Sequence, residues 1–215
     1  TGAQPERHGI PGNVWFDPEQ RLFRDYGSMD HYRDVNGDYG VPTIYERITP
    51  LHSANVQGAH IRGVSEDTAY WAQAGVLWYL NGYSAVDALS GAAVDLVAQH
   101  ANQRGWWPDL LLCYFPGVDT VGHEFGVSSR QYKAAMRVFD DQVGRVCEWL
   151  ARQDMLEQTQ LVLLSDHGHM AVSPAGHVDL TALITDRWQR RVTDRIRQEE
   201  NAASRRRYYD QFDTV

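Results

Sequence analysis

Two short motifs place metal-binding side chains just after runs of apolar residues. Four such residues follow the runs 110–115 and 161–164: Asp119, His123, Asp166 and His167. Carboxylate oxygens and imidazole nitrogens are ligands that suit zinc and similar divalent cations. Ligand sites in α/β proteins form beyond the carboxyl ends of strands. The pattern therefore predicts a metal centre of the kind found in two-metal hydrolases.

The spacing within each motif decides whether its two side chains can meet at one metal centre. In the first motif, the small Gly122 would let a loop fold back so that both side chains reach one ion. In the second motif the two residues are adjacent, and adjacent residues of a strand point to opposite faces. They can serve one centre only if the chain turns sharply, which Gly168 permits. Two ions roughly 4 Å apart could clamp the attacking and leaving oxygens of a phosphoryl transfer.

Each motif also has an ordinary structural explanation. An isolated Asp and His four residues apart is common, and Asp166 could cap a turn while His167 lies at the surface. Their joint occurrence, each after an apolar run and separated by one long predicted helix, favours the metal centre. Three further residues are weaker candidates. His177 could supply another ligand, Asn13 could contact a phosphoryl oxygen, and we expect His169 to lie behind the ligands or at the surface.

The elements that must position these residues follow from hydrophobic periodicity and turn signals. The predicted elements are a β segment at 14–16, a surface loop at 18–40, a helix at 42–48, a strand within 53–62, a helix capped by Asp67 and ending near Leu80, a helix at 86–101, a strand at 109–115, a helix capped by Ser128 or Ser129, and a strand at 160–164. Strands 109–115 and 160–164 are apolar enough to be buried on both faces. Helices between such strands imply an α/β fold with a mostly parallel sheet flanked by helices.

Composition narrows the class of protein. The 215 residues are enough for a substantial core, and a net charge of −8 argues against a nucleic-acid partner. Cys113 and Cys147 are interpreted as small core residues. No apolar stretch approaches the ~20 residues that span a bilayer. The chain opens at Thr1 without an initiator Met or a signal-peptide pattern, so we expect an excerpt of a longer protein.

The predicted domain organisation has two parts. Residues 1–186 form an incomplete α/β domain, and residues 187–215 form an Arg-rich helical segment that begins a cap or continues the domain. The Arg-rich segment is either a solvated, salt-bridged helix or an electropositive wall near an anionic substrate.

Several segments resemble one enzyme family. Residues 108–126 resemble the metal-binding segment of the type I phosphodiesterase/nucleotide pyrophosphatase family, which belongs to the alkaline phosphatase superfamily. Residues 164–168 resemble its second metal segment. Residues 1–10 and 13–17 resemble the stretch that follows the nucleophile in that family.

The resemblance implies an alkaline phosphatase-like fold and a pair of divalent ions, zinc in this family. Asp119 and His123 would share one ion with a His further along, and Asp166 and His167 would share the other with an upstream Asp. A Thr or Ser nucleophile would lie upstream of Thr1 and form a covalent intermediate, so no catalytic residue is expected in this chain. The substrate would be a small phosphate ester or a nucleotide, and the location extracytoplasmic.

The chain departs from the family pattern because the nucleophile and the upstream Asp have no counterpart in it. We therefore expect the chain by itself to be inactive. Alternatives within the superfamily are a phosphomonoesterase, a phosphonate hydrolase or a sulfatase. A catalytically incompetent module of the same fold is the alternative outside enzymes.

Overall fold

The computed structural model describes residues 1–27, 31–171 and 178–188. Its contacts group the chain into two units. The first unit contains Thr1–Gly9 and Val35–Ala171, and the second contains Ile10–Asp34 and Val172–Val215. The domain boundary expected at residue 186 stays a prediction.

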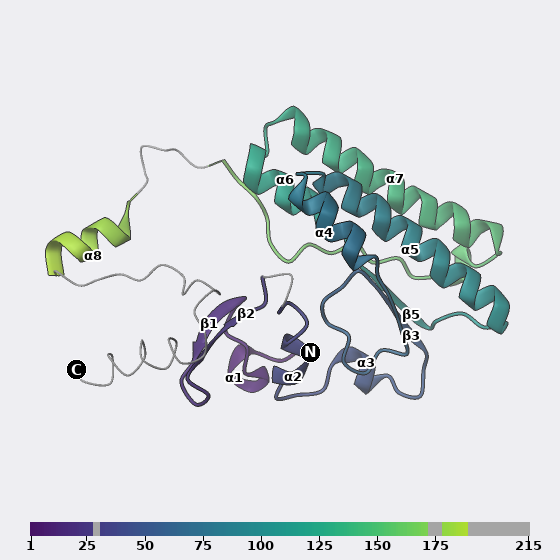
Figure 1. Cartoon of the computed structure of the whole chain (residues 1–215). Helices are drawn as coiled ribbons and strands as arrows, with labels where there is room; N and C mark the ends of the chain where they lie inside the picture. The colour runs from purple at the N-terminus through teal and green to yellow at the C-terminus, as the bar shows by residue number, and fades with distance from the viewer. Residues whose placement is uncertain (28–30, 172–177, 189–215) are drawn as a thin grey trace. The chain divides into compact units, whose positions relative to one another are not determined.

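A three-stranded parallel sheet forms the centre of the first unit (Figure 1). Its strands are β3 (Ser53–Val56), β4 (Glu66–Thr68) and β5 (Leu110–Cys113). The order is β4-β3-β5, and both neighbouring pairs are parallel. Because two helices lie between β4 and β5 in the chain and the sheet is parallel, the prediction of an α/β fold is confirmed.

Helices of very different length accompany this sheet. They are α1 (Pro5–His8), α2 (Val35–Asp38), α3 (Ile44–Arg47), α4 (Trp71–Tyr79), α5 (Tyr83–Arg104), α6 (Gly117–Phe125), α7 (Arg130–Arg152) and the 3₁₀ turn η1 (Leu156–Gln158). Helix α7 begins as predicted, because the Ser129 side chain accepts a hydrogen bond from the Tyr132 N–H at 3.0 Å. Helix α3 is capped by Thr43 in a capping box with Glu46, so it starts two residues after Pro42.

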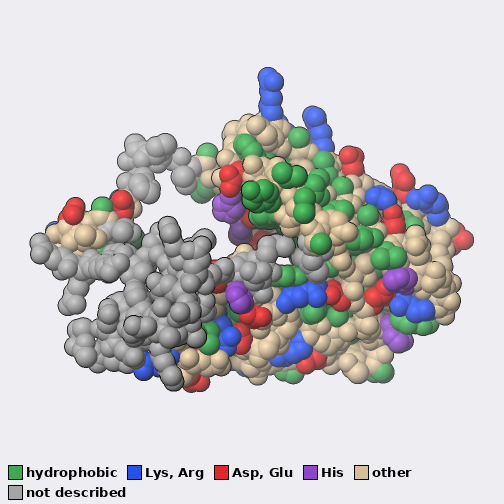
Figure 2. Space-filling view, in the orientation of Figure 1, with side chains coloured by type: hydrophobic (Ala, Val, Ile, Leu, Met, Phe, Trp, Pro, Cys, Tyr) green, Lys and Arg blue, Asp and Glu red, His purple; other side chains and the backbone are tan. Residues whose placement is uncertain are grey.

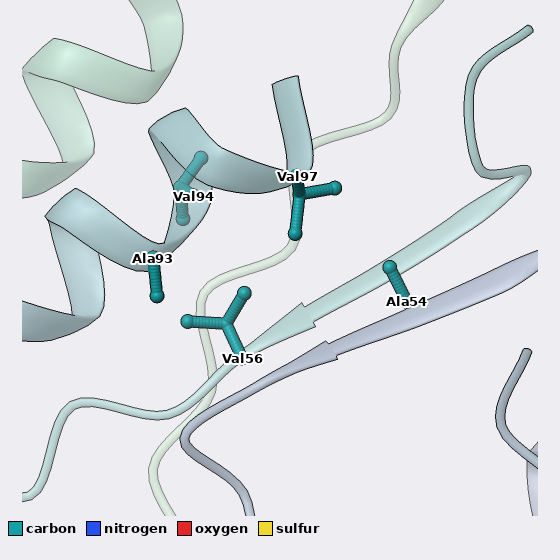
Figure 3. Packing of buried hydrophobic residues seen from close by; sticks show 5 residues of the cluster. All are labelled: Ala54, Val56, Ala93, Val94 and Val97. Atoms are coloured by element: carbon teal, nitrogen blue, oxygen red, sulfur yellow. The ribbon is translucent and has the colours of Figure 1, made fainter. Parts of the chain in front are cut away.

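The core lies between the sheet and α5. Five small apolar side chains of β3 and α5 make it, as Figure 3 shows: Ala54, Val56, Ala93, Val94 and Val97. Successive side chains of a strand alternate between faces, so Asn55 lies on the opposite face of β3. There its amide oxygen accepts a hydrogen bond from the Tyr45 hydroxyl of α3 at 3.3 Å. The sheet is therefore covered by α5 on one face and by α3 on the other.

The predictions for Asp67 and for residues 18–40 are wrong. Asp67 caps no helix, because it lies within β4, where its carboxylate accepts a hydrogen bond from the Asn55 amide at 2.9 Å. The following helix instead begins at Trp71. The loop expected at 18–40 contains the strand Leu22–Asp25 and the short helix α2. In both places pairing with a neighbouring segment outweighed local propensity.

The second apolar run is not a buried strand. Residues Leu161 to Leu164 form no strand, and their exposed fractions run from 47% to 89%. A strand forms by pairing, and no described strand pairs with this run. Strand β5 is also less buried than predicted, because Leu112 is 41% exposed. Cys113 does pack against the core, as expected.

Among the described residues, the second unit contains a β-hairpin and the helix α8. Strands β1 (Val14–Asp17) and β2 (Leu22–Asp25) pair antiparallel, and the Phe16 and Phe23 rings pack with centroids 5.3 Å apart. The β segment predicted at 14–16 is therefore confirmed. Helix α8 spans Leu180–Trp188. Within the described residues, no helix has both the length and the apolar character that crossing a membrane requires.

Candidate metal centre

The first motif lies on a helix rather than in a loop. Helix α6 follows β5 after the three residues 114–116, and Asp119 and His123 are four residues apart on it. Residues at this spacing share one helix face, so both side chains point the same way without any folding back of the chain. The Asp119 Oδ1 and His123 Nε2 atoms are 3.5 Å apart. Rigid helical geometry thus performs the role that the sequence suggested for a glycine-containing loop.

The second motif lies in a bend, as its sequence required. The chain bends at Asp166 and His167. The Asp166 carboxylate accepts a hydrogen bond from the His167 N–H at 3.1 Å, and the Ser165 hydroxyl donates to the His167 carbonyl oxygen. These local bonds hold the bend, which turns the His167 side chain toward α6.

The two motifs meet at Asp119. Its Oδ1 atom is 3.2 Å from His167 Nε2 and 2.8 Å from His169 Nε2. Together with His123, these residues offer four ligand atoms within 4.8 Å of one another. Zinc bonds of 2.0–2.1 Å in a tetrahedron place neighbouring ligand atoms about 3.3 Å apart. The donor types suit a divalent cation such as zinc, and the distances of 2.8, 3.2 and 3.5 Å from Asp119 Oδ1 to the three imidazoles lie near this spacing.

Histidine side chains reach the surface beside α6 (Figure 2). The side chains of Asp119, His123 and His167 are 46%, 66% and 49% exposed, whereas that of His169 is only 15% exposed. A small residue makes room for this buried ring. A Cβ atom on Gly122 would lie 2.9 Å from His169 Nδ1. Gly122 is therefore needed to admit an imidazole rather than to bend a loop.

Negative charge gathers beyond the carboxyl end of β5. Partial burial raises the pKa of the Tyr114 hydroxyl, and the carboxylates of Asp119, Asp166 and Asp87 raise it further. Burial also raises the pKa of Asp87 to about 7, against the opposing effect of a hydrogen bond from the Gly117 backbone. A cation bound here would meet several carboxylates at short range, which favours its binding.

The predicted site residues have different outcomes. The structure brings Asp119, His123 and His167 together, whereas Asp166 lies outside this four-residue group and stays a predicted ligand. His177 lies outside the described residues. Asn13 is exposed and belongs to the second unit.

His169 is the residue that the sequence reasoning left out of the ligand set. The usable signal in the sequence is its type and place: a third imidazole two positions after His167. The burial of its ring against Gly122 needed the structure.

Comparison with known proteins gives the same family that the motifs suggested. The family model for type I phosphodiesterase/nucleotide pyrophosphatase matches residues 1–213. An uncharacterized pyrophosphatase/phosphodiesterase of Schizosaccharomyces pombe is 28% identical over 183 residues, which cover 78% of this chain and 34% of that protein. A venom phosphodiesterase of Macrovipera lebetinus is 24% identical over 181 residues, covering 80% of this chain and 20% of the relative.

A third relative is the ectonucleotide pyrophosphatase/phosphodiesterase 1 of Saccharomyces cerevisiae. It is 23% identical over 200 residues, covering 78% of this chain and 26% of the yeast protein. The chain thus spans between a fifth and a third of the length of these relatives. The match to the family model covers nearly the whole chain, and so the chain belongs to the type I phosphodiesterase/nucleotide pyrophosphatase family of phosphoric-ester hydrolases.

Proposed function

We propose that the complete protein is a phosphodiesterase or nucleotide pyrophosphatase that works with a pair of zinc ions. The observation that supports this most directly is the convergence of Asp119, His123, His167 and His169 from two segments far apart in the sequence. The names of the relatives, which include phosphodiesterases and pyrophosphatases, support the same chemistry.

Asp119 has the central role in the proposed centre. One of its carboxylate oxygens lies within 3.5 Å of the Nε2 atoms of three imidazoles. It therefore supplies a carboxylate oxygen at the point where the three imidazoles converge. Asp166 is the further carboxylate that a second ion would use, and its neighbour His167 already lies in the group. When bound, the ions would polarise a phosphoryl oxygen and activate the attacking hydroxyl or water.

The nucleophile of the proposed reaction is a Thr or Ser upstream of Thr1. The present chain would hold the ions and orient the phosphate, with α6 and the bend at Asp166 as fixed supports. The substrate is a small phosphate ester or a nucleotide. Relatives that are named venom and ectonucleotide enzymes support an extracytoplasmic location.

The proposal is tested by activity of the complete protein toward p-nitrophenyl phosphodiesters. Chelator treatment should abolish hydrolysis, and added zinc should restore it. Asp119→Asn and Asp166→Ala should each abolish hydrolysis, because each removes a charged ligand. Asp140→Asn is the matched control, since Asp140 is an exposed carboxylate on α7, and it should leave activity unchanged.

Full activity after metal removal, or in both ligand variants, would contradict the metal assignment. A parallel assay with phosphomonoester, phosphonate and sulfate ester substrates separates the alternatives within the superfamily. Zinc binding with no hydrolysis of any ester would identify a catalytically incompetent module.

A further inference from the structure

A buried carboxylate on α5 contacts the start of α6. Asp87 is completely buried, and its Oδ1 atom accepts a hydrogen bond from the Gly117 N–H at 2.8 Å. Gly117 is the first residue of α6, and the backbone N–H groups of a first helical turn have no partner within the helix. The residue before it, Pro116, caps the helix without any side-chain hydrogen bond. Asp87 thus accepts, from a different helix, the kind of N–H hydrogen bond that the side chain of an N-cap residue accepts in other helices.

The contact between the two helices is very close. A Cβ atom on Gly117 would lie 2.5 Å from Asp87 Oδ2 and 2.8 Å from the Tyr83 carbonyl oxygen. The start of α6 can therefore take this place only as glycine. Next to it, Tyr83 packs in a small buried cluster with Val121 of α6. The hydrogen bond and the apolar contact together fix the position of α6 against α5.

The chemical purpose of this contact follows from what α6 carries. Asp119 lies two residues after Gly117, in the first turn of the helix, and its Oδ1 atom approaches three imidazoles within 3.5 Å. A shift of the helix start by a fraction of an ångström would change all three distances. The Asp87 carboxyl oxygen also lies at the N-terminal end of the α6 dipole, where the helix favours a hydrogen-bond acceptor.

We propose that Asp87 is a positioning residue of the metal centre, which holds the N-terminus of α6 through the Gly117 N–H and so places the Asp119 carboxylate among the histidines. This inference rests on the proposed function, because it requires that the group binds metal. Asp87 acts through Gly117 and is not a ligand.

The test is the zinc affinity of the complete protein and its variants, measured by competition with a chromogenic chelator. Asp87→Ala should weaken zinc binding by about 10-fold or more, the loss that partners of metal ligands cause. Asp87→Asn should restore most of the affinity, because its amide oxygen can still accept the Gly117 N–H bond. Asp87→Glu, one methylene longer, should lose affinity although it keeps the charge.

Ser90→Ala is the matched control on the same helix. Ser90 is as buried as Asp87, but its hydroxyl donates to the Val86 carbonyl oxygen within α5 and not to a backbone group of α6. Urea unfolding of every variant gives its stability, so that affinity can be compared with the free energy of unfolding. Ser90→Ala should lose stability without losing zinc affinity.

Parent-like affinity in Asp87→Ala would overturn the inference while leaving the proposed function standing. A loss that merely follows stability, as a purely structural role would give, would also overturn it. So would equal losses in Asp87→Asn and Asp87→Ala. If Asp87→Ala does not fold, the zinc affinities of Asp87→Asn and Asp87→Glu test the inference. An affinity of Asp87→Glu equal to that of the parent would refute the positioning role. No zinc binding by the complete parent protein would refute the proposed function itself.

Discussion

At the scale of residues, the side chains of the candidate metal centre converge on a single oxygen atom. Asp119 Oδ1 lies 2.8 Å from His169 Nε2, 3.2 Å from His167 Nε2 and 3.5 Å from His123 Nε2. Three imidazoles that share one carboxylate oxygen have donors pointed at a common region. A carboxylate at this place can bring a full negative charge to a bound cation, which an amide does not supply.

The residues of this group could be predicted only in part. Asp119, His123 and His167 were visible because their types and their positions after apolar runs are specific. His169 looked unremarkable in sequence, since its role depends on the space that Gly122 leaves on another helix. Asp87 was also invisible, because its burial against Gly117 comes from packing between segments 30 residues apart.

The buried carboxylate of Asp87 predicts a pH dependence of stability. Burial raises its pKa from 3.8 to about 7, so between these values the folded protein holds a proton that the unfolded chain has lost. Stability must then fall as the pH rises from about 4 to 7, by up to a few kcal/mol, since each pKa unit is about 1.4 kcal/mol.

Asp87→Asn removes this titration and should flatten the slope in that range. Urea unfolding at several pH values measures it. An unchanged slope in the variant would show that other groups cause the dependence.

At the scale of elements, α6 shows why its motif was misinterpreted. Asp119-Thr-Val-Gly-His123 contains a glycine and two β-branched residues, which favour a loop by propensity alone. The helix nevertheless forms, because Val121 is buried against Tyr83 and because Asp87 accepts the first N–H. Tertiary contacts of this kind cannot be read from a window of sequence. The long helices α5 and α7 were predictable because their apolar positions recur with helical spacing.

Two glycines in helices give a matched pair of substitutions. Gly122→Ala should raise helix propensity but push the His169 ring away, since the new Cβ would lie 2.9 Å from Nδ1. We expect weaker zinc binding from it. Gly144→Ala on α7 meets no atom within 4 Å and should stabilise the protein by up to about 1 kcal/mol with unchanged zinc affinity.

Chelator competition and urea unfolding measure both effects. If the two variants bind zinc equally well, His169 is not among the donors.

For the whole molecule, the parallel sheet and its helical layers were predicted correctly because apolar runs alternated with helix-length segments. The second run failed as a strand because pairing depends on a neighbour that local sequence does not reveal. Periodicity also does not show which segments belong to one unit. The first unit joins Thr1–Gly9 to Val35–Ala171, although a segment of the second unit lies between them in the sequence.

Metal binding should raise the thermal stability of the folded chain as a unit. Zinc at 100 times its dissociation constant adds about 2.7 kcal/mol to the folded state. For a chain of this size that corresponds to a rise in melting temperature of roughly 5–10 °C. Asp119→Asn should abolish the rise, whereas Asp140→Asn should keep it. Differential scanning calorimetry with and without zinc measures the shift, and an equal shift in both variants would contradict the proposed centre.

The uncovered run from Leu161 to Leu164 has a consequence for how this polypeptide behaves in concentrated solution. Four adjacent aliphatic side chains facing water are the kind of segment through which separate molecules adhere and precipitate. Mutual repulsion opposes this, because the chain carries a net charge of −8 at neutral pH. This electrostatic repulsion between molecules vanishes near the isoelectric point of about 5.5, and salt screens it. We therefore expect the protein to stay in solution best at alkaline pH and low ionic strength.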